Sequence, residues 1–250
     1  MKTIVITKKH LLTGCVCVFT ALLCIFGSMG AFAASDKKLP IYCVDCEKKQ
    51  IAISFDAAWG NDDTETLIKI LDEYKVPATF FVVGAWVDKY PESVKQLSDA
   101  GHQVQNHSNT HPYMTKLSSE QMKNEIETCN KKIAAITGKT PTLIRFPYGD
   151  YNNAAVTQTH ELNMNCVQWS VDSLDWQDSA TPESIYKRVT SKVEPGSIVL
   201  FHNDAEHTPE ALPNILKTLK DEGYEFVFIS DLIMKDNYTI DHAGKQCKIK

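Results

Sequence analysis

The acidic, basic and imidazole side chains that can do chemistry share one setting in this sequence. Asp56, His107, Arg145, Asp175 and His202 each lie at or soon after the C-terminal end of a short apolar run. Such runs predict buried strands, and a barrel of parallel strands gathers its carboxyl ends at one rim. We therefore expect these five side chains to share one site.

Two of the histidines, His107 and His111, lie four residues apart in the segment HSNTH. In a helical turn both rings would project to the same side, at ligand distance for a divalent metal. An isolated pair with this spacing is equally well explained by two surface histidines, so the interpretation depends on the residues around it.

Asp56 and His202 are suited to proton transfer. Asp56 follows the apolar run 51–55, and a carboxylate there can accept a proton from a metal-bound water, whose pKa falls toward about 7. His202 ends the run 197–201 and can protonate a leaving amine. Because no GxSxG turn or comparable nucleophile motif is present, hydrolysis by an activated water is favoured over covalent acyl transfer.

Two further segments supply supporting groups. In RFPYG, the guanidinium of Arg145 adjoins a rigid turn and can hold the Asp56 carboxylate, while a nearby backbone N–H faces the reacting carbonyl. In DSLDW, the carboxylates of Asp172 and Asp175 precede Trp176. Each segment alone is equally compatible with a core or loop role.

The elements that must position these residues alternate along the chain. Short apolar runs predict strands at 51–55, 78–83, 143–146, 165–169, 197–201 and 225–229, with a weaker one at 102–105. Amphipathic patterns predict helices at 64–74, 91–100, 120–136, 153–162, 182–192 and 209–222. This alternation predicts a parallel sheet covered by helices, either open or closed into a barrel.

Capping residues mark several of the helix starts. Thr181 and Thr208 each place a hydroxyl before a proline, and Ser118 with Gln121 fits a capping box. These signals fix where three helices begin.

The first 33 residues read as an export signal. Lys2, Lys8 and Lys9 precede an uncharged stretch that ends in Ala31-Phe32-Ala33, which predicts a signal peptide cleaved after Ala33. The alternative is an uncleaved anchor, because the stretch approaches the roughly 20 apolar residues that span a bilayer. Both alternatives put the remaining chain outside the cytoplasm, secreted or associated with the cell wall, with membrane contact only through this segment.

The rest of the chain suits one domain with an acidic balance. We expect a linker at 34–48, a catalytic domain at 49–235 and a C-terminal tail at 236–250. Loss of residues 1–33 removes three lysines and no acidic residue, so the formal net charge changes from −5 to −8. This charge argues against a nucleic-acid partner. The five cysteines after residue 33 are an odd number for an exported chain.

Together and in this order, the motifs resemble those of the polysaccharide deacetylases of carbohydrate esterase family 4, the group with the NodB homology domain. FDAAWGNDDT, HSNTH, RFPYG, DSLDW and LFH resemble that family's five motifs, and the resemblance covers about residues 48–232. It implies a deformed (β/α) barrel of about seven parallel strands. The FDAAWGN variant resembles the sporulation-associated branch, which implies a spore or cell-wall substrate.

The resemblance also implies roles for single residues. Asp56 would be the base and His202 the acid, Arg145 would orient Asp56, and Asp175 would tune His202. The ligands of a divalent metal, zinc or alternatively cobalt, would include His107 and His111. The Tyr148 backbone N–H would stabilise the oxyanion, and Trp176 and Leu200 would line the acetyl pocket.

This chain departs from the family pattern at the third metal ligand. The family usually has a second Asp directly after the base, whereas this chain has Ala57. Asp62 and Asp63 follow in a short loop, and we expect Asp63 to complete a set of two histidines and one aspartate.

The predicted function is metal-dependent removal of N-acetyl groups from a cell-wall or spore polysaccharide, by a monomeric enzyme. One alternative is a glycan-binding or structural spore protein that keeps the fold but holds metal poorly, because fold does not imply function. The other is an O-deacetylase acting on acetylated xylan or a similar ester. Trp59, Trp86 and Trp169 are candidates for stacking on sugar rings, and Trp86 is the best placed of the three.

Overall fold

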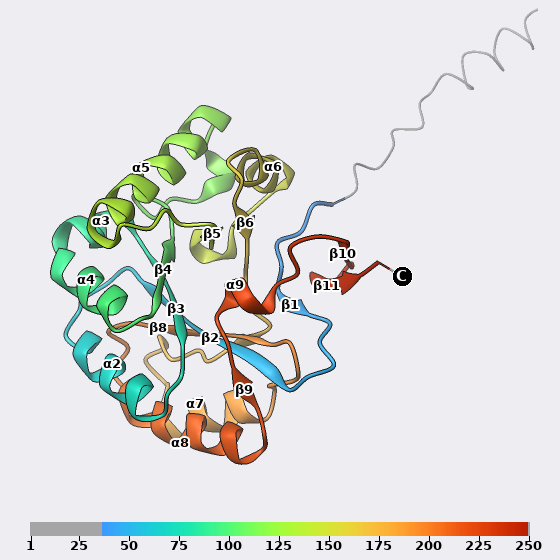
Figure 1. Cartoon of the computed structure of the whole chain (residues 1–250). Helices are drawn as coiled ribbons and strands as arrows, with labels where there is room; N and C mark the ends of the chain where they lie inside the picture. Colours follow the sequence, from blue (N-terminus) through green and yellow to red (C-terminus); the bar gives the residue numbers. More distant parts are fainter. Residues whose placement is uncertain (1–36, 250) are drawn as a thin grey trace, which may run out of the picture. The chain divides into compact units, whose positions relative to one another are not determined.

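A computed structural model describes residues 37–249, so the predicted export segment at 1–33 lies outside the described residues. The compact unit begins at Lys38 and is built around one parallel sheet (Figure 1). Its strands follow the order β6-β5-β4-β3-β2-β8-β7, and β9 pairs separately with β2. Their bounds are β2 (Gln50–Ala57), β3 (Ala78–Val82), β4 (Gln103–Asn106), β5 (Leu143–Ile144), β6 (Asn165–Cys166), β7 (Val171–Asp172), β8 (Ile198–His202) and β9 (Glu225–Phe226).

Strand β2 is an interior strand of this sheet, between β3 and β8, and is buried on both faces. Ile53, Phe55 and Ala57 belong to the main apolar cluster, and Phe55 stacks on Phe80 and Phe201 with ring centroids 4.7 and 5.6 Å apart. Burial on both faces explains why β2 reads as a continuous apolar run instead of an alternating one. The polar groups at its end are therefore held by the best-packed strand of the fold.

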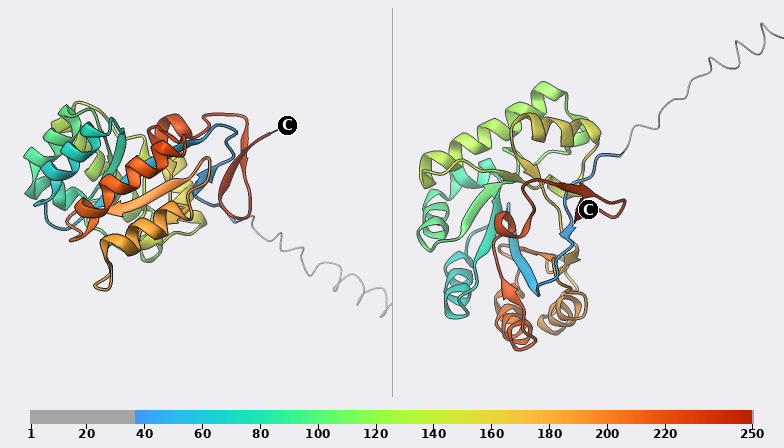
Figure 2. Two further views of the ribbon diagram at one scale, coloured as in Figure 1. Left: turned by 90° about the horizontal axis from the view of Figure 1, so that it is seen from below. Right: turned by 45° about the vertical axis from the view of Figure 1, so that its right-hand side comes forward.

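Helices cover the outer face of the sheet in both further views (Figure 2). They are α2 (Thr64–Glu73), α3 (Gly84–Lys89), α4 (Pro91–Asp99), α5 (Ser119–Thr137), α6 (Asn153–Glu161), α7 (Pro182–Thr190) and α8 (Thr208–Asp221). Helix α9 (Ile229–Leu232) lies inside this ring of helices instead, where Ile229 and Leu232 share an apolar cluster with Ala52, Phe81 and Ile198 (Figure 1). The predicted deformed (β/α) barrel is confirmed, with seven parallel strands in one continuous order. Within residues 37–249 we find no helix that is long and apolar enough to span a membrane.

The segment before β2 connects β6, at one end of the sheet, with β8, the strand next to the other end. Ile41 forms a bridge to Val167 beside β6, and Cys43 forms one to Ser197 beside β8. Strand β1 (Cys43–Val44) also pairs with a C-terminal hairpin of β10 (Tyr238–Ile240) and β11 (Lys245–Lys248). Ile41 and Val44 are 2% and 3% exposed, so residues before the predicted start at 49 are packed, and residues after the predicted end at 235 pair with β1.

The sequence located most helix starts correctly. Ser118 and Gln121 form the predicted capping box, and Thr181 caps α7 in the same manner. The prediction for Thr208 is wrong, because α8 begins at Thr208 itself and His207 is its N-cap. Each of the five cysteines after residue 33 is a free thiol.

Candidate active site

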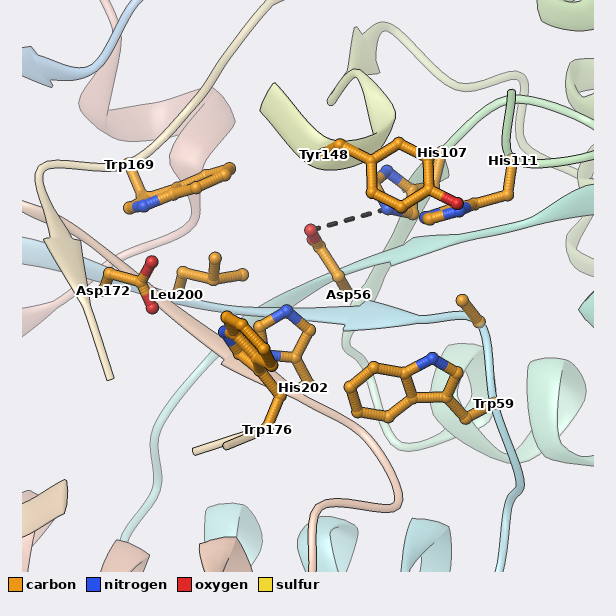
Figure 3. A pocket seen from close by; sticks show the side chains of 11 residues that line it. Asp56, Trp59, His107, His111, Tyr148, Trp169, Asp172, Trp176, Leu200 and His202 are labelled. Carbon is orange, nitrogen blue, oxygen red and sulfur yellow. Dashed lines mark ion pairs between the residues drawn. The ribbon is translucent and has the colours of Figure 1, made fainter. Parts of the chain in front are cut away.

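A pocket of about 550 Å³ opens at the C-terminal ends of the strands (Figure 3). The two histidines of HSNTH lie on one side of Asp56 in this view, and His202 and Trp59 lie on the other. The residues that line the pocket are Asp56, Ala58, Trp59, His107, His111, Tyr148, Trp169, Asp172, Trp176, Leu200 and His202. The strand-end residues of the sequence are thus brought together as predicted, with Arg145 and Asp175 directly behind them.

Asp56 is held by a buried ion pair. Arg145 Nη1 donates to Asp56 Oδ1 at 2.7 Å, and Nη2 donates to Ser54 Oγ at 2.9 Å and to the Gln168 carbonyl at 3.2 Å. Arg145 is 0% exposed, and its guanidinium lies over the Phe81 ring at 4.2 Å. Several contacts therefore fix the guanidinium, which fixes one oxygen of Asp56 in turn.

The surroundings of Asp56 keep it ionised. Burial is the largest single influence and acts to raise the pKa of this carboxyl group, but the charge and hydrogen bond of Arg145, together with His107 and His202, outweigh it, so the pKa is lowered overall. With Oδ1 occupied by Arg145, Oδ2 points toward His107 and lies 3.5 Å from its Nε2. Asp56 thus presents one charged oxygen that is not paired with Arg145.

The loop carrying His107 and His111 is not the helical turn that the spacing predicts. Its backbone N–H groups are bound by side chains: Asn106 Oδ1 accepts from Ser108 N at 2.7 Å, and Ser108 Oγ accepts from His111 N at 3.0 Å. Ser108 and His111 have φ values of 67° and 61°, which no α-helix contains. The imidazoles still meet, with ring centroids 4.9 Å apart.

Both imidazoles are uncharged at neutral pH. His107 Nδ1 donates to the Arg145 carbonyl at 2.8 Å, which fixes the tautomer and leaves the Nε2 lone pair facing the pocket. Burial lowers the pKa of His107, and burial together with His107 lowers the pKa of His111 to about 4. Neutral imidazoles with one ring nitrogen held by a carbonyl are the form that binds metals.

The third metal ligand is missing from the described residues. No group of three His, Cys, Asp or Glu side chains that could hold a metal occurs within 37–249. The predicted third ligand, Asp63, does not line the pocket, and its Oδ2 accepts a hydrogen bond from Asp204 N at 2.8 Å. Ala57 is 1% exposed and packs in the apolar cluster. The two imidazoles therefore do not form the three-ligand site that catalytic zinc normally has.

His202 is oriented by a second carboxylate. Its Nδ1 donates to Asp175 Oδ1 at 2.7 Å, and its backbone N–H donates to Asp175 Oδ2 at 2.8 Å. Thr208 Oγ1 donates to the same Oδ2 at 2.7 Å. The hydroxyl predicted to cap a helix is thus used to hold Asp175 in place.

The same contacts favour a charged His202. Burial acts to lower the pKa of the imidazole, but the hydrogen bond and charge of Asp175 outweigh burial, so the pKa is raised. Strand register sets Asp56 directly beside His202 across β2 and β8. A carboxylate and an imidazolium, each held by its own partner, are therefore neighbours at one rim.

The remaining predicted residues also reach the pocket, and the backbone there is strained. Tyr148 is 59% exposed, Trp176 is 50% exposed, and Leu200 lies on the pocket wall. Strain in the left-handed region costs roughly 1–3 kcal/mol per residue and tends to occur at functional sites. The non-glycine residues with positive φ on the loops around this pocket are Ser108, His111, Tyr148, Leu174 and Asp204.

The prediction that Trp86 is the tryptophan best placed to stack on a sugar ring is wrong. Trp86 is 3% exposed, and its Nε1 donates to the Gly60 carbonyl at 2.8 Å, so it is a structural residue. Trp59 and Trp169 line the pocket instead. The position of Trp59, three residues after Asp56, indicates that it lies near the site. Its exposure could not be predicted, because it depends on contacts between loops that are distant in sequence.

Comparison with known proteins identifies relatives of this chain. The family model described as polysaccharide deacetylase matches residues 44–167. The Bacillus subtilis protein YlxY is 33% identical over 78% of this chain, which spans 60% of YlxY. The peptidoglycan-N-acetylmuramic acid deacetylase PdaA of B. subtilis is 32% identical over 78% of this chain and 75% of PdaA.

A similar solved structure is that of BA3943 from Bacillus anthracis, described as a family 4 pseudoenzyme. It is 34% identical, superposes with a TM-score of 0.74, and is matched over 77% of this chain and 68% of that chain. At this level of identity and overlap, shared ancestry is the simplest explanation of the common barrel.

Proposed function

Because the chain belongs to the polysaccharide deacetylase family, we propose that it removes N-acetyl groups from peptidoglycan or a related cell-wall polysaccharide. The observation that carries this proposal is the pair formed by Asp56 and His202. Each lies at the end of a strand, faces the same pocket, and is held by a buried partner, Arg145 or Asp175. Amide hydrolysis needs one group to accept a proton and another to donate one.

Asp56 is proposed as the general base. Its lowered pKa keeps it ionised, and Arg145 occupies Oδ1, so Oδ2 is the oxygen that accepts the proton of the attacking water. The new bond forms between the water oxygen and the acetyl carbon. The Tyr148 backbone N–H is proposed to donate to the oxygen that becomes negative in the tetrahedral intermediate.

His202 is proposed as the general acid. Because Asp175 holds Nδ1, the proton that can be transferred is on Nε2. As the carbon–nitrogen bond breaks, this proton passes to the sugar nitrogen, giving acetate and a free amine. Trp176 and Leu200 are proposed to line the space for the acetyl methyl group.

For the metal, we propose only the two ligands that this chain offers. His107 and His111 are the two ligands that this chain offers to a divalent cation such as zinc or cobalt, and such an ion would supply Lewis-acid chemistry at the acetyl oxygen. Asp63 as third ligand stays a prediction, and its engagement with Asp204 does not support it. The steps above use only groups of the chain itself.

We also propose that the protein acts outside the cytoplasm on the wall or the spore. The basic, then uncharged, N-terminal sequence and the peptidoglycan substrate in the name of PdaA support this location. A sporulation role rests on the FDAAWGN segment alone.

One observation favours a second function, glycan binding with little or no turnover. The third metal ligand is missing within residues 37–249, and the similar BA3943 is described as a pseudoenzyme that has a mutant with restored activity. In this alternative the pocket and the aromatic side chains that line it bind N-acetylated polysaccharide without cleaving it.

Substrate assays test the main proposal against both alternatives. The purified protein is incubated with N-acetylated peptidoglycan, a chitin oligomer and acetylated xylan, and released acetate and free amine are measured. Equal amounts of acetate and amine from the first two substrates support N-deacetylation. Acetate from xylan alone supports O-deacetylation, and binding without acetate release supports the glycan-binding function.

A further inference from the structure

We propose that Trp59 is a specificity-determining residue that stacks on a sugar ring of the substrate next to His202. This inference rests on the proposed function for its substrate class. Trp59 lies in the loop after β2, lines the pocket, and is 47% exposed. In Figure 3 its indole lies beside His202, on the side of the pocket opposite the two histidines of HSNTH.

The loop that carries Trp59 is tightly fixed by side chains from elsewhere in the fold. Asn203 is 2% exposed and bridges the loop, because its Oδ1 accepts from Ala58 N at 3.2 Å and its Nδ2 donates to the Gly60 carbonyl. Gly60 N donates to Asp204 Oδ2 at 3.1 Å. The backbone at Trp59 is therefore held between two anchored residues, Ala58 and Gly60.

Glycine is required at position 60 by close packing. A Cβ at Gly60 would lie 2.2 Å from Asp204 Oδ2, so a larger residue would push the Asp204 carboxylate away. The carbonyl of Gly60 also accepts the indole N–H of the buried Trp86. These contacts fix a short loop whose large side chain is left half exposed, and a rigid support of this kind lowers the entropy cost of binding a ligand.

Trp59 uses part of its surface to contact His202 and leaves the rest open to the pocket. The indole and imidazole rings are stacked, with centroids 5.3 Å apart and planes 16° apart. An aromatic ring stacked on one face keeps its other face available, and aromatic side chains pack well against flat, partly apolar partners. The apolar face of a pyranose is such a partner, and it would lie within reach of the proposed acid.

The comparison with Trp86 separates this function from a structural one. Both tryptophans contact the same loop, but Trp86 is 3% exposed and hydrogen-bonded, as expected of a residue that only supports the fold. Trp59 is exposed on the rim of the pocket. Its placement is that of a residue that binds a ligand.

Calorimetric titration with a chitin tetramer tests the inference without requiring turnover. The unmutated protein is compared with the variants Trp59→Ala, Trp59→Leu and Trp59→Phe. Leucine keeps apolar volume but has no flat face, whereas phenylalanine keeps the face. Loss of stacking should weaken binding about tenfold or more in the alanine and leucine variants, while phenylalanine should stay within about threefold.

The outcomes distinguish this inference from the proposed function. Thermal unfolding of each variant checks that the fold is intact, and the phenylalanine variant keeps the test usable if the smaller side chains destabilise the loop. If the alanine variant binds the oligomer as tightly as the unmutated protein does, the proposed role of Trp59 is wrong. The proposed deacetylase function is not contradicted by that result. Failure of the unmutated protein to bind the oligomer also overturns the inference, and acetate release measured in parallel then decides the proposed function separately.

Discussion

The two sides of the pocket are built to different degrees of completeness. On one side Asp56 and His202 extend from adjacent strands, and each is fixed by a buried partner. On the other side His107 and His111 lie on a strained loop, and no third ligand accompanies them among residues 37–249. The comparison teaches that the proposed proton-transfer groups and the proposed metal ligands are held by different elements, so that one set can be complete while the other is not.

The difference between the two sides of the pocket follows from the positions of the residues on the strands. Asp56 and His202 are paired residues of β2 and β8, so the barrel itself sets their separation. Ala57, the next residue of β2, faces the apolar cluster, as expected from the alternation of side chains along a strand. A carboxylate in place of Ala57 would begin in an apolar environment and would have to be drawn toward the histidines by a metal.

The largest effect is expected for Asp56→Asn, which removes the proposed base and leaves a similar shape. Turnover should fall about 100 to 10,000-fold, because a positioned base commonly contributes that much. Acetate release under saturating substrate measures the change. Retention of most of the turnover would assign the proton-transfer role to another group.

The same substitution also disturbs a buried ion pair. Arg145 would lose its charged partner, and an unpaired buried charge commonly costs about 3–5 kcal/mol of unfolding free energy. Denaturant unfolding of Asp56→Asn separates this loss from the loss of catalysis. Ser54→Ala is the matched control, since it removes one contact of Arg145 without touching the carboxylate.

The pH dependence of turnover should respond to Asp175→Asn. Asp175 raises the pKa of His202 above its usual value, so the acid stays protonated to higher pH and activity falls as pH rises through that raised pKa. An uncharged amide stabilises the imidazolium less than a carboxylate does, so burial then lowers the pKa and the alkaline limb should move to lower pH. A pH–rate profile whose alkaline limb does not move would contradict the pairing.

The same linkage gives a sign for stability. The raised pKa of His202 contributes stability that is fully present below the unfolded pKa of about 6.5, and that is lost as pH rises through the folded pKa. Asp175→Asn should abolish this part of the pH dependence. Unfolding midpoints measured across the range test it.

Ala57→Asp tests whether a third ligand at position 57 completes the metal site. Without metal the variant should unfold at a lower temperature, because a carboxylate enters an apolar cluster. Zinc should then stabilise the variant, by about 2.7 kcal/mol at a concentration 100 times its dissociation constant, and should stabilise the unmutated protein less. An equal response to zinc in both proteins would show that two histidines suffice, and the added response should disappear when His111→Ala is combined with Ala57→Asp.

Thr208→Val should have the smallest effect of the four substitutions. It removes the hydroxyl that donates to Asp175 and keeps the side-chain volume. One lost hydrogen bond to a charged group is worth about 1.5–3 kcal/mol, part of it seen in stability and part in a small fall in the pKa of His202. An alkaline limb displaced as far as in Asp175→Asn would mean that the hydroxyl, and not the carboxylate charge, controls His202.

Much of the barrel could be predicted from the sequence because its signals are local. The predicted helices match the observed ones to within about two residues at most ends, as for α4 (Pro91–Asp99) against 91–100. The short strand β7 and helix α3 were missed, because two residues of strand or six of helix carry too little pattern. The packing of Ile41 and Cys43 could not be predicted, because it depends on Val167 and Ser197, which are distant in sequence.

The meeting of side chains in one pocket could be predicted where strands carry them and not where loops do. Asp56, Arg145 and His202 could be found because each marks a strand end. The prediction of a helical turn at His107 is wrong, because the side chains of Asn106 and Ser108 accept hydrogen bonds from the N–H groups of the loop. The exposure of Trp59 depends on loop–loop contacts that no spacing reveals.

Acetate release from N-acetylated peptidoglycan, measured together with the metal content of the same purified protein, tests the proposed function most directly. We predict acetate release that is lost in Asp56→Asn while the metal content stays the same as in the unmutated protein. Acetate release that is absent from the unmutated protein even with added zinc or cobalt would contradict the deacetylase function and favour glycan binding.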